Sequence, residues 1–222
     1  MDKHEPLFEF LPQDIIVSCV EKAFKNLNSG TFGEKSIRTM TLSKQVICGI
    51  FHELIVNEIA QLPDWYPGKQ GEEADIVHFD GLQLQVKTST SFEGIAGNRY
   101  ASQNEYSDPS EFYLCVNFIP FKCITKIRAG FVESDSWKPQ TGKGNAATLS
   151  LECLNAMPFL KGSYIEEILL SSIKGIGKST LAKLGEIQKL YHLKNPEFYH
   201  KAKSIIPTKS WSEIEPLLSY FK

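Results

Sequence analysis

Apolar residues along the chain follow two different patterns, a helical period and short continuous runs. Over residues 11–28, and again over residues 42–62, apolar side chains return every three or four positions, which predicts two amphipathic helices. Ser43 is placed to cap the second helix, because its hydroxyl can accept a backbone hydrogen bond in the first turn. Residues 111–120 and 122–132 are apolar runs with aromatic and β-branched side chains, which predict buried strands. The mixture of helices and strands predicts an α/β fold.

A shorter segment, residues 74–87, reads ADIVHFDGLQLQVK and predicts a β-hairpin. Two short apolar runs flank an Asp-Gly pair at 80–81, which is a strong signal for a tight turn. The hairpin would carry three polar side chains of chemical interest, Asp75, Gln85 and Lys87.

The number of residues in the hairpin loop, odd or even, decides whether these side chains lie on the same face of the hairpin. Gln85 and Lys87 share a face because successive side chains alternate. A two-residue turn would place Asp75 opposite Val86 and away from both. A three-residue loop that ends in Gly81, with this glycine at positive φ, would instead place Asp75 opposite Gln85. The chemistry needs the second arrangement, and we predict it.

An acid followed by an oxygen ligand two residues before a lysine suits a metal site that activates water. Asp75, the Gln85 side-chain carbonyl and the Val86 backbone oxygen are hard ligands of the kind that Mg²⁺ prefers. Lys87 beside the metal could position or deprotonate the attacking water. The pattern resembles the PD-(D/E)xK nuclease motif, with Gln85 in place of the usual acid. An ordinary half-exposed hairpin with a solvated lysine would also match it.

Further candidate residues lie close to the hairpin in sequence. Glu53, on the flank of the second predicted helix, could assist the metal or its waters, and Glu58 is the alternative. Either could also be a solvated helix residue. Five polar residues that follow the hairpin are candidates for phosphate or base contacts, although each could be a plain loop residue: Thr88, Ser89, Ser91, Asn98 and Arg99.

Net charge alone does not indicate a nucleic-acid-binding protein, because it is −2 over 222 residues. The distribution changes this picture. Residues 161–209 hold nine lysines and four acids, a net charge of +5, which leaves −7 for the remainder. A basic C-terminal part suits a polyanionic partner, although a lysine-rich helical surface is also common. The five cysteines form no CxxC pair and no long apolar run is present, so we expect a cytoplasmic protein without a membrane span.

The C-terminal part contains a possible phosphate-binding turn. Lys174, Gly175, Gly177 and Lys178 lie between two helical patterns, in an arrangement that resembles a helix-hairpin-helix. A P-loop is a rival interpretation, but Ser172 stands where that motif needs glycine. A plain helix-turn-helix is a further alternative.

Four stretches, in order, resemble the restriction endonuclease family typified by ScaI: SKQVICGIFHEL, VKTSTS, GNRYASQ, and IRAGFVESDSW followed by TGKGNAATLS. The resemblance covers roughly residues 40–155. It implies a restriction-endonuclease-like central mixed β-sheet flanked by helices over residues 1–160. The helical patterns that follow predict a small helical module over residues 161–222. The resemblance also implies a Mg²⁺-dependent enzyme that cuts both strands of double-stranded DNA at a short palindromic site. A homodimer and a companion DNA methyltransferase are the expected partners. The alternative is a DNA-binding protein whose nuclease core has decayed, with Gln85 as the relic.

Overall fold

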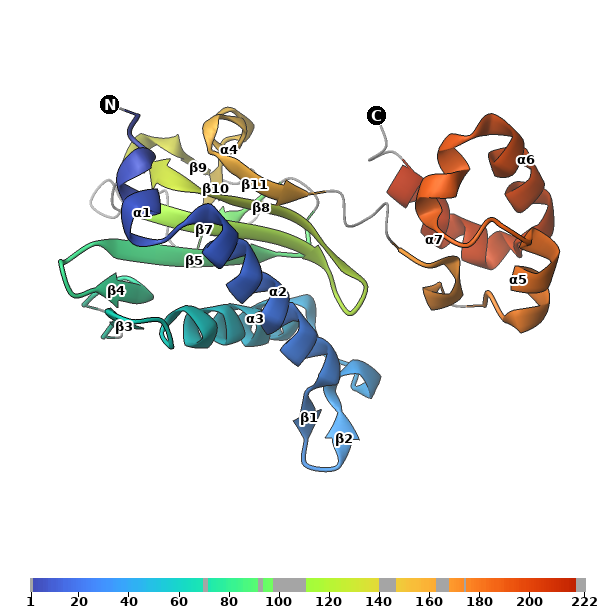
Figure 1. The fold of residues 1–222 in the computed structure, drawn as a ribbon, viewed down its shortest axis with the longest axis horizontal. Coiled ribbons are helices and arrows are strands. Elements are labelled where there is room, and N and C mark those ends of the chain that lie inside the picture. Colours follow the sequence, from blue (N-terminus) through green and yellow to red (C-terminus); the bar gives the residue numbers. More distant parts are fainter. Residues whose placement is uncertain are drawn as a thin grey trace. The chain divides into compact units, whose positions relative to one another are not determined.

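The chain divides into two compact units in the computed structural model (Figure 1). Unit 1 comprises residues 1–162 and unit 2 comprises residues 163–222. The structure describes residues 2–69, 72–91, 94–97, 111–139, 147–162, 168–173 and 175–218.

A mixed β-sheet forms the centre of unit 1. In the described residues it has six strands in the order β11-β8-β7-β5-β4-β3 (Figure 1). Strands β5 and β7 pair in parallel, and the other neighbours are antiparallel. The predicted fold class is therefore confirmed. The strands are β3 (Trp65–Pro67), β4 (Ile76–His78), β5 (Gln83–Ser89), β7 (Glu111–Ile119), β8 (Cys123–Val132) and β11 (Phe159–Gly162).

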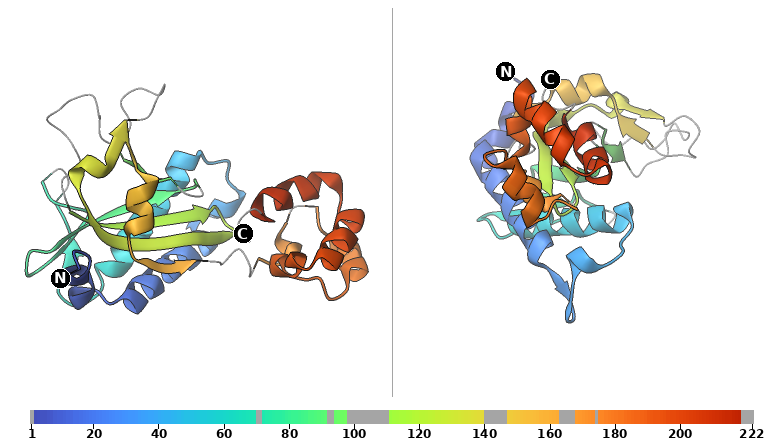
Figure 2. Two further views of the ribbon diagram at one scale, coloured as in Figure 1. Left: turned by 90° about the horizontal axis from the view of Figure 1, so that it is seen from above. Right: turned by 90° about the vertical axis from the view of Figure 1, so that its right-hand side faces the viewer.

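Helices α2 (Gln13–Ser29) and α3 (Lys44–Ile59) cover one face of this sheet (Figures 1 and 2). Phe51 of α3 packs edge-on against Phe118 of β7, with ring centroids 4.7 Å apart. The predicted cap is confirmed, because the Ser43 hydroxyl accepts a hydrogen bond from the backbone N–H of Val46 at 3.3 Å. A short helix that the apolar periodicity did not predict, α1 (Glu5–Phe10), precedes α2.

A small second sheet and a helix cover the opposite face. The sheet has the order β6-β10-β9 and lies with helix α4 on the side away from α2 and α3 (Figure 2). Tyr113 and Cys115 of β7 join a buried apolar cluster there that includes Trp137 and Leu154. Strand β7 is thus packed on both faces, as its continuous apolar run predicts. The elements on this side are β6 (Ala96–Gly97), η2 (Ser134–Ser136), β9 (Trp137–Pro139), β10 (Ala147–Leu149) and α4 (Leu151–Ala156).

Two segments with no periodic pattern in the sequence contain short strands. The segment between α2 and α3 holds β1 (Thr31–Phe32), β2 (Lys35–Ser36) and the 3₁₀ turn η1 (Ile37–Thr39). Strand β3 lies in the segment before the predicted hairpin and pairs with β4. Strands of two or three residues are too short to show a hydrophobic period, so only their pairing reveals them.

Unit 2 is helical where the structure describes it. Its core contains Leu184, Leu190, Trp211 and Ile214. The turn at Gly175 and Gly177 leads into α5, but the described residues before it form only a 3₁₀ turn, so the first helix of the expected helix-hairpin-helix is not observed among them. No helix in the described parts of the chain is long and apolar enough to cross a membrane. The elements of unit 2 are η4 (Leu170–Ser172), α5 (Lys178–Leu184), η5 (Leu190–Lys194), α6 (Pro196–Ile205) and α7 (Thr208–Leu218).

Candidate active site

The β4–β5 hairpin has the register that brings the motif residues to one face. Ile76 pairs with Leu84, and the backbone N–H of His78 donates to the Leu82 oxygen at 2.9 Å. The three-residue loop between them ends in Gly81, whose φ is +87°. The predicted loop and its glycine at positive φ are confirmed. The same register places Asp75 opposite Gln85, so parity allows the two side chains to share a face.

Asp75 lies directly before β4, where the pairing of β4 with the edge of β5 ends. Strand β4 begins at Ile76, which pairs with Leu84, and beyond that pair the outer edge of β5 lacks a strand partner in β4. The Asp75 carboxylate fills this gap, because Oδ2 accepts a hydrogen bond from the Val86 backbone N–H at 2.7 Å. The N–H and C=O of a residue in a strand point to the same side. The Val86 peptide oxygen therefore points to the same edge as the carboxylate.

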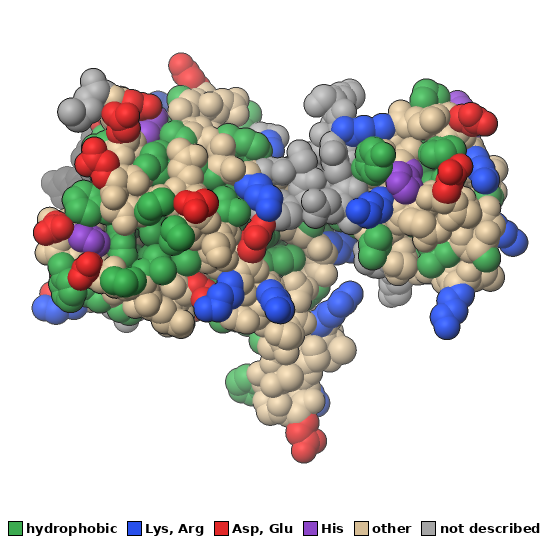
Figure 3. Space-filling model, in the orientation of Figure 1, with side chains coloured by type: hydrophobic (Ala, Val, Ile, Leu, Met, Phe, Trp, Pro, Cys, Tyr) green, Lys and Arg blue, Asp and Glu red, His purple; other side chains and the backbone are tan. Residues whose placement is uncertain are grey.

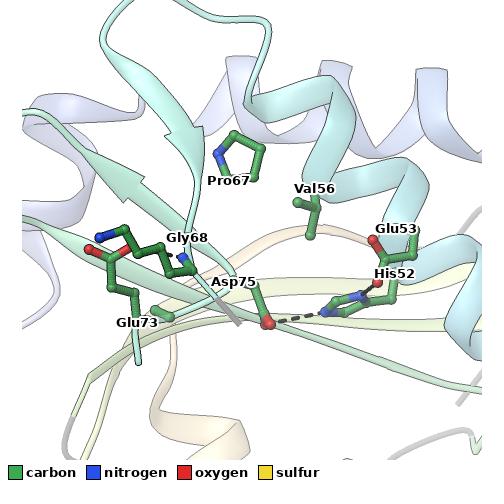
Figure 4. A pocket seen from close by; sticks show the side chains of 9 residues that line it. His52, Glu53, Val56, Pro67, Gly68, Glu73 and Asp75 are labelled. Atoms are coloured by element: carbon green, nitrogen blue, oxygen red, sulfur yellow. Dashed lines mark hydrogen bonds and ion pairs between the residues drawn. The ribbon is translucent and has the colours of Figure 1, made fainter. Parts of the chain in front are cut away.

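Helix α3 contributes two further polar side chains. His52 Nε2 lies 3.2 Å from Asp75 Oδ2, and His52 Nδ1 lies 3.3 Å from a carboxylate oxygen of Glu53 (Figure 4). Glu53 is 70% exposed, whereas His52 and Asp75 are both partly buried. His52 was not among the residues predicted from sequence. The sequence shows that His52 directly precedes Glu53, but it does not show the contact with Asp75, which lies on a different element.

The charges in this cluster stabilise one another. Burial opposes the charging of His52, but the hydrogen bond and charge of Asp75, together with the charge of Glu53, outweigh it and raise the pKa of His52. Burial also opposes ionisation of Asp75, yet the contacts with His52, the charge of Lys87 and the Val86 N–H together lower the pKa of Asp75. Asp75 is therefore ionised at neutral pH and can bind a cation without first losing a proton.

Two hollows in the surface of unit 1 meet at this cluster. His52, Glu53 and Asp75 line both hollows, which have volumes of about 360 and 350 Å³. The second hollow is also lined by Val86, Lys87 and Thr88 from β5 and by Gln45, Cys48 and Gly49 from the start of α3.

Lys87 interacts with both other polar residues of the motif, Gln85 and Asp75. Its Nζ donates to the Gln85 side-chain oxygen at 3.4 Å, and its charge acts on Asp75. The structure thus brings Asp75, Val86, Lys87 and Glu53 around one hollow, with Gln85 in contact with Lys87.

Glu58, the alternative to Glu53, lies elsewhere. Its side chain is only 7% exposed, and it forms an ion pair with Lys22 at 2.6 Å and accepts a hydrogen bond from Asn26 at 2.9 Å. These contacts join α3 to α2. Of the two glutamates, the structure places Glu53 at the site.

The residues that follow the hairpin take part in local structure. The Thr88 hydroxyl donates to the backbone oxygen of Cys48, and the hydroxyls of Ser89 and Ser91 accept backbone hydrogen bonds from Ser91 and Gly94. Three other candidates lie outside the described residues: Asn98, Arg99 and Lys174. The remaining three, Gly175, Gly177 and Lys178, lie in unit 2.

The oxygen donors at the hairpin are of the kind that a hard divalent cation takes. The set comprises an ionised carboxylate (Asp75), an amide oxygen (Gln85) and a peptide oxygen (Val86) that points to the carboxylate's edge. Oxygen ligands of this kind are those that Mg²⁺ takes in proteins. No cluster of three or more His, Cys, Asp and Glu side chains that could hold a metal ion exists among the described residues. A metal here would therefore depend on the amide and peptide oxygens.

The mixed sheet, the helix packed beside the hairpin and the acid, amide and lysine on that hairpin define a fold of the restriction-endonuclease-like class. The model of the ScaI restriction endonuclease family matches residues 2–157, more than half of the chain, and the chain belongs to this family. It is a type II site-specific deoxyribonuclease whose substrate is DNA. No curated protein matches the chain in sequence.

Proposed function

We propose that the protein is a Mg²⁺-dependent enzyme that hydrolyses both strands of double-stranded DNA at a short palindromic site. The observation that carries this proposal is the arrangement at the edge of β5, where Asp75 binds the Val86 N–H and Lys87 lines the same hollow. Membership of the ScaI family supports it, because restriction endonucleases generally use Mg²⁺. A homodimer and a companion DNA methyltransferase that protects the same site belong to the proposal.

Asp75, Gln85 and the Val86 peptide oxygen would hold the metal. Asp75 Oδ2 already accepts hydrogen bonds from Val86 and His52, so we assign the other carboxylate oxygen, Oδ1, to the metal. When bound, Mg²⁺ stabilises the negative charge that builds on the phosphate. Glu53 is exposed beside His52 and would bind waters of the metal.

Lys87 acts on the attacking water in this proposal. Its Nζ is held near the Gln85 oxygen, at the hollow where Asp75 lies. From there Lys87 would orient the water or accept its proton as the water oxygen bonds to phosphorus. The P–O bond to the leaving deoxyribose oxygen breaks, and this oxygen takes a proton from solvent. His52 holds the Asp75 carboxylate in place through its Nε2.

DNA contacts would come from both units. Thr88, Ser89 and Ser91, with Asn98 and Arg99, follow Lys87 in sequence and are proposed to contact phosphates or base edges. In unit 2, Lys174 and Lys178 with Gly175 and Gly177 are proposed to bind the DNA backbone as a helix-hairpin-helix-like turn.

The test is cleavage of plasmid DNA by the purified full chain with and without Mg²⁺, with Lys87→Ala beside the wild type. We expect cutting at discrete sites only with Mg²⁺. Lys87→Ala should lower the cleavage rate by at least about 100-fold, the scale of acid–base catalysis, while DNA binding persists. A Lys87→Ala enzyme that cuts at the wild-type rate would show that the site is assigned wrongly.

Gln85 gives one observation in favour of a second function. A nuclease-derived protein that only binds DNA could tolerate an amide where the motif carries an acid. This alternative predicts sequence-specific binding with no cleavage at any Mg²⁺ concentration.

A further inference from the structure

The segment between α2 and α3 projects from unit 1 as an arm, which we define as residues 31–43. It contains the β1–β2 hairpin and η1, and it extends away from the central sheet (Figures 1 and 2). No residue from 31 to 46 is buried, although all of them are described. A two-stranded hairpin without a buried face is marginal on its own. Such an arm contributes little to the core of unit 1, and its side chains are free to contact a partner.

The arm is nevertheless held in a defined shape. Phe32 pairs with Lys35 across a two-residue turn whose first residue, Gly33, has a φ of +61°. A glycine at this position is what a type II′ hairpin turn requires. At the base, the Ile37 N–H donates to the Gly30 oxygen at 3.0 Å. The arm therefore presents its side chains from a fixed frame.

The arm and its flanks are basic, in contrast to the rest of unit 1. Unit 1 has 15 Lys and Arg against 20 Asp and Glu. Residues 25–46 hold four cations and the single acid Glu34, a net charge of +3, which leaves −8 for the rest of the unit. In Figure 3 basic side chains gather where the arm leaves the body of unit 1. The four cations are Lys25, Lys35, Arg38 and Lys44.

These four cations have no counter-ion among the described residues, whereas three other lysines of unit 1 have one. Lys3, Lys22 and Lys161 form ion pairs with Glu133, Glu58 and Glu21. None of the four cations of the arm and its flanks forms an ion pair within the described part of the chain. Unpaired cations grouped on an exposed element attract a polyanion, because phosphates release counter-ions when they are neutralised.

An exposed aromatic side chain adds a second feature. Phe32 stands beside the turn and is 77% exposed, more than any other large hydrophobic side chain among the described residues. Apolar side chains presented in this way can pack into a DNA groove or wedge between base steps. Phe32 and Lys35, paired across the hairpin, would reach a groove and its phosphates together.

The position of the arm links it to the candidate active site. One hollow at Asp75 is lined along α3 by His52, Gly49, Cys48 and Gln45. This line of residues ends in the first turn of α3, and the arm precedes that turn directly. From His52 to Lys44 the helix rises by about 12 Å. A duplex seated at the hollow would continue toward the arm.

We propose that the arm is a DNA-binding element separate from the catalytic hairpin. Lys35 and Arg38 bind phosphates, Lys25 and Lys44 extend the same basic surface, and Phe32 packs into the adjoining groove. Duplex DNA is the occupant that the charge favours, and a second copy of the chain is the rival occupant.

The test measures binding of a mixed-sequence duplex by fluorescence anisotropy in EDTA, over a range of salt concentrations. No cleavage chemistry is involved, so the result does not depend on the assignment of Asp75 and Lys87. Lys35→Ala/Arg38→Ala should lower affinity and make the log–log salt dependence shallower by about two units. Phe32→Ala should lower affinity about fivefold or more, with the salt dependence retained.

Matched controls separate a specific contact from a general reduction of charge. Lys3→Ala/Lys138→Ala removes the same charge from unit 1 outside the arm, where Lys3 pairs with Glu133 and Lys138 Nζ donates to the Asp135 backbone oxygen. Phe159→Ala removes a 57% exposed phenylalanine from β11. Both controls should bind as the wild type does. Melting temperatures of the arm variants should stay unchanged, because the arm buries no residue.

Three results would overturn the proposal. The arm variants could bind with wild-type affinity, or the charge control could lose as much affinity as Lys35→Ala/Arg38→Ala. Alternatively, sedimentation velocity could show that the arm variants lose a dimer while DNA affinity persists. That result would make the arm a contact between copies of the chain.

Discussion

Gln85 is the residue at which the proposed site differs most from the motif it resembles. An amide oxygen can bind a cation, but it brings no negative charge to the metal. Asp75 already uses one carboxylate oxygen for the Val86 N–H and for His52. The proposed set of ligands therefore contains one carboxylate, that of Asp75. Replacing the Gln85 amide by a carboxylate or by an apolar group tests whether residue 85 binds the metal.

We predict that Gln85→Glu keeps cleavage activity and lowers, or at least does not raise, the Mg²⁺ concentration required for half-maximal rate. The added carboxylate restores a charged ligand. Gln85→Leu, which has no side-chain oxygen, should lose at least about 10- to 100-fold in activity, a loss seen even for residues outside the first ligand layer. The measurement is the cleavage rate as a function of Mg²⁺ concentration. An active Gln85→Leu enzyme would exclude Gln85 as a ligand.

At the scale of elements, the site depends on the loop of the β4–β5 hairpin. A loop of another parity would turn Asp75 to the opposite face from Gln85, because strand side chains alternate. Gly81 permits the loop through its positive φ, and a Cβ there would meet no atom within 4 Å. Any cost of a side chain at Gly81 is thus a cost of backbone conformation alone.

Gly81→Ala should lower the free energy of unfolding by about 1–2 kcal/mol, the cost of a left-handed conformation for a residue with Cβ. The matched control is Gly49→Ala in α3, where a Cβ likewise meets no atom within 4 Å. Because that glycine is helical, alanine should raise the free energy of unfolding by about 0.5–1 kcal/mol. Urea denaturation of both variants measures the two shifts. Equal signs would contradict the assigned loop.

Long periodic segments were predictable from sequence, and elements made by long-range pairing were not. The helices α2 and α3, the strands β7 and β8 and the loop at Gly81 were all predicted. Strands β1, β3 and β6 have two or three residues each, which is too few for a period. His52 was not predicted as a site residue because its partner Asp75 lies on another element, and no spacing in the sequence relates a helix residue to the edge of a strand.

At the scale of the whole molecule, positive charge is distributed unevenly along the chain. The described part of the candidate active site lies in unit 1, whereas the basic stretch of residues 161–209 lies almost entirely in unit 2. Phosphate contacts of surface lysines there would position DNA without reading its sequence. They would add affinity for any DNA and leave site selection to unit 1.

Lys174→Ala/Lys178→Ala should therefore weaken binding equally for duplexes with and without the recognition site. The log–log salt dependence should become shallower by about one unit for each phosphate that the variant no longer neutralises. Anisotropy titrations of the full chain with both duplexes measure this. Weaker binding of the cognate duplex alone would instead identify these lysines as base readers and remove the case for a helix-hairpin-helix.

A palindromic site has two-fold symmetry, and a homodimer that matches it would place one Asp75–Lys87 site at each strand. We predict that a heterodimer of one wild-type and one Lys87→Ala subunit, purified with two different tags, nicks supercoiled plasmid and stops at the open-circular product. One subunit would cut its strand while the other only binds. The wild-type homodimer should instead give linear DNA, and the Lys87→Ala homodimer should leave the plasmid supercoiled. Agarose gels of the time course distinguish the three forms. A heterodimer that linearises plasmid as fast as the wild type would show that one active site serves both strands, and the isologous arrangement would then be wrong.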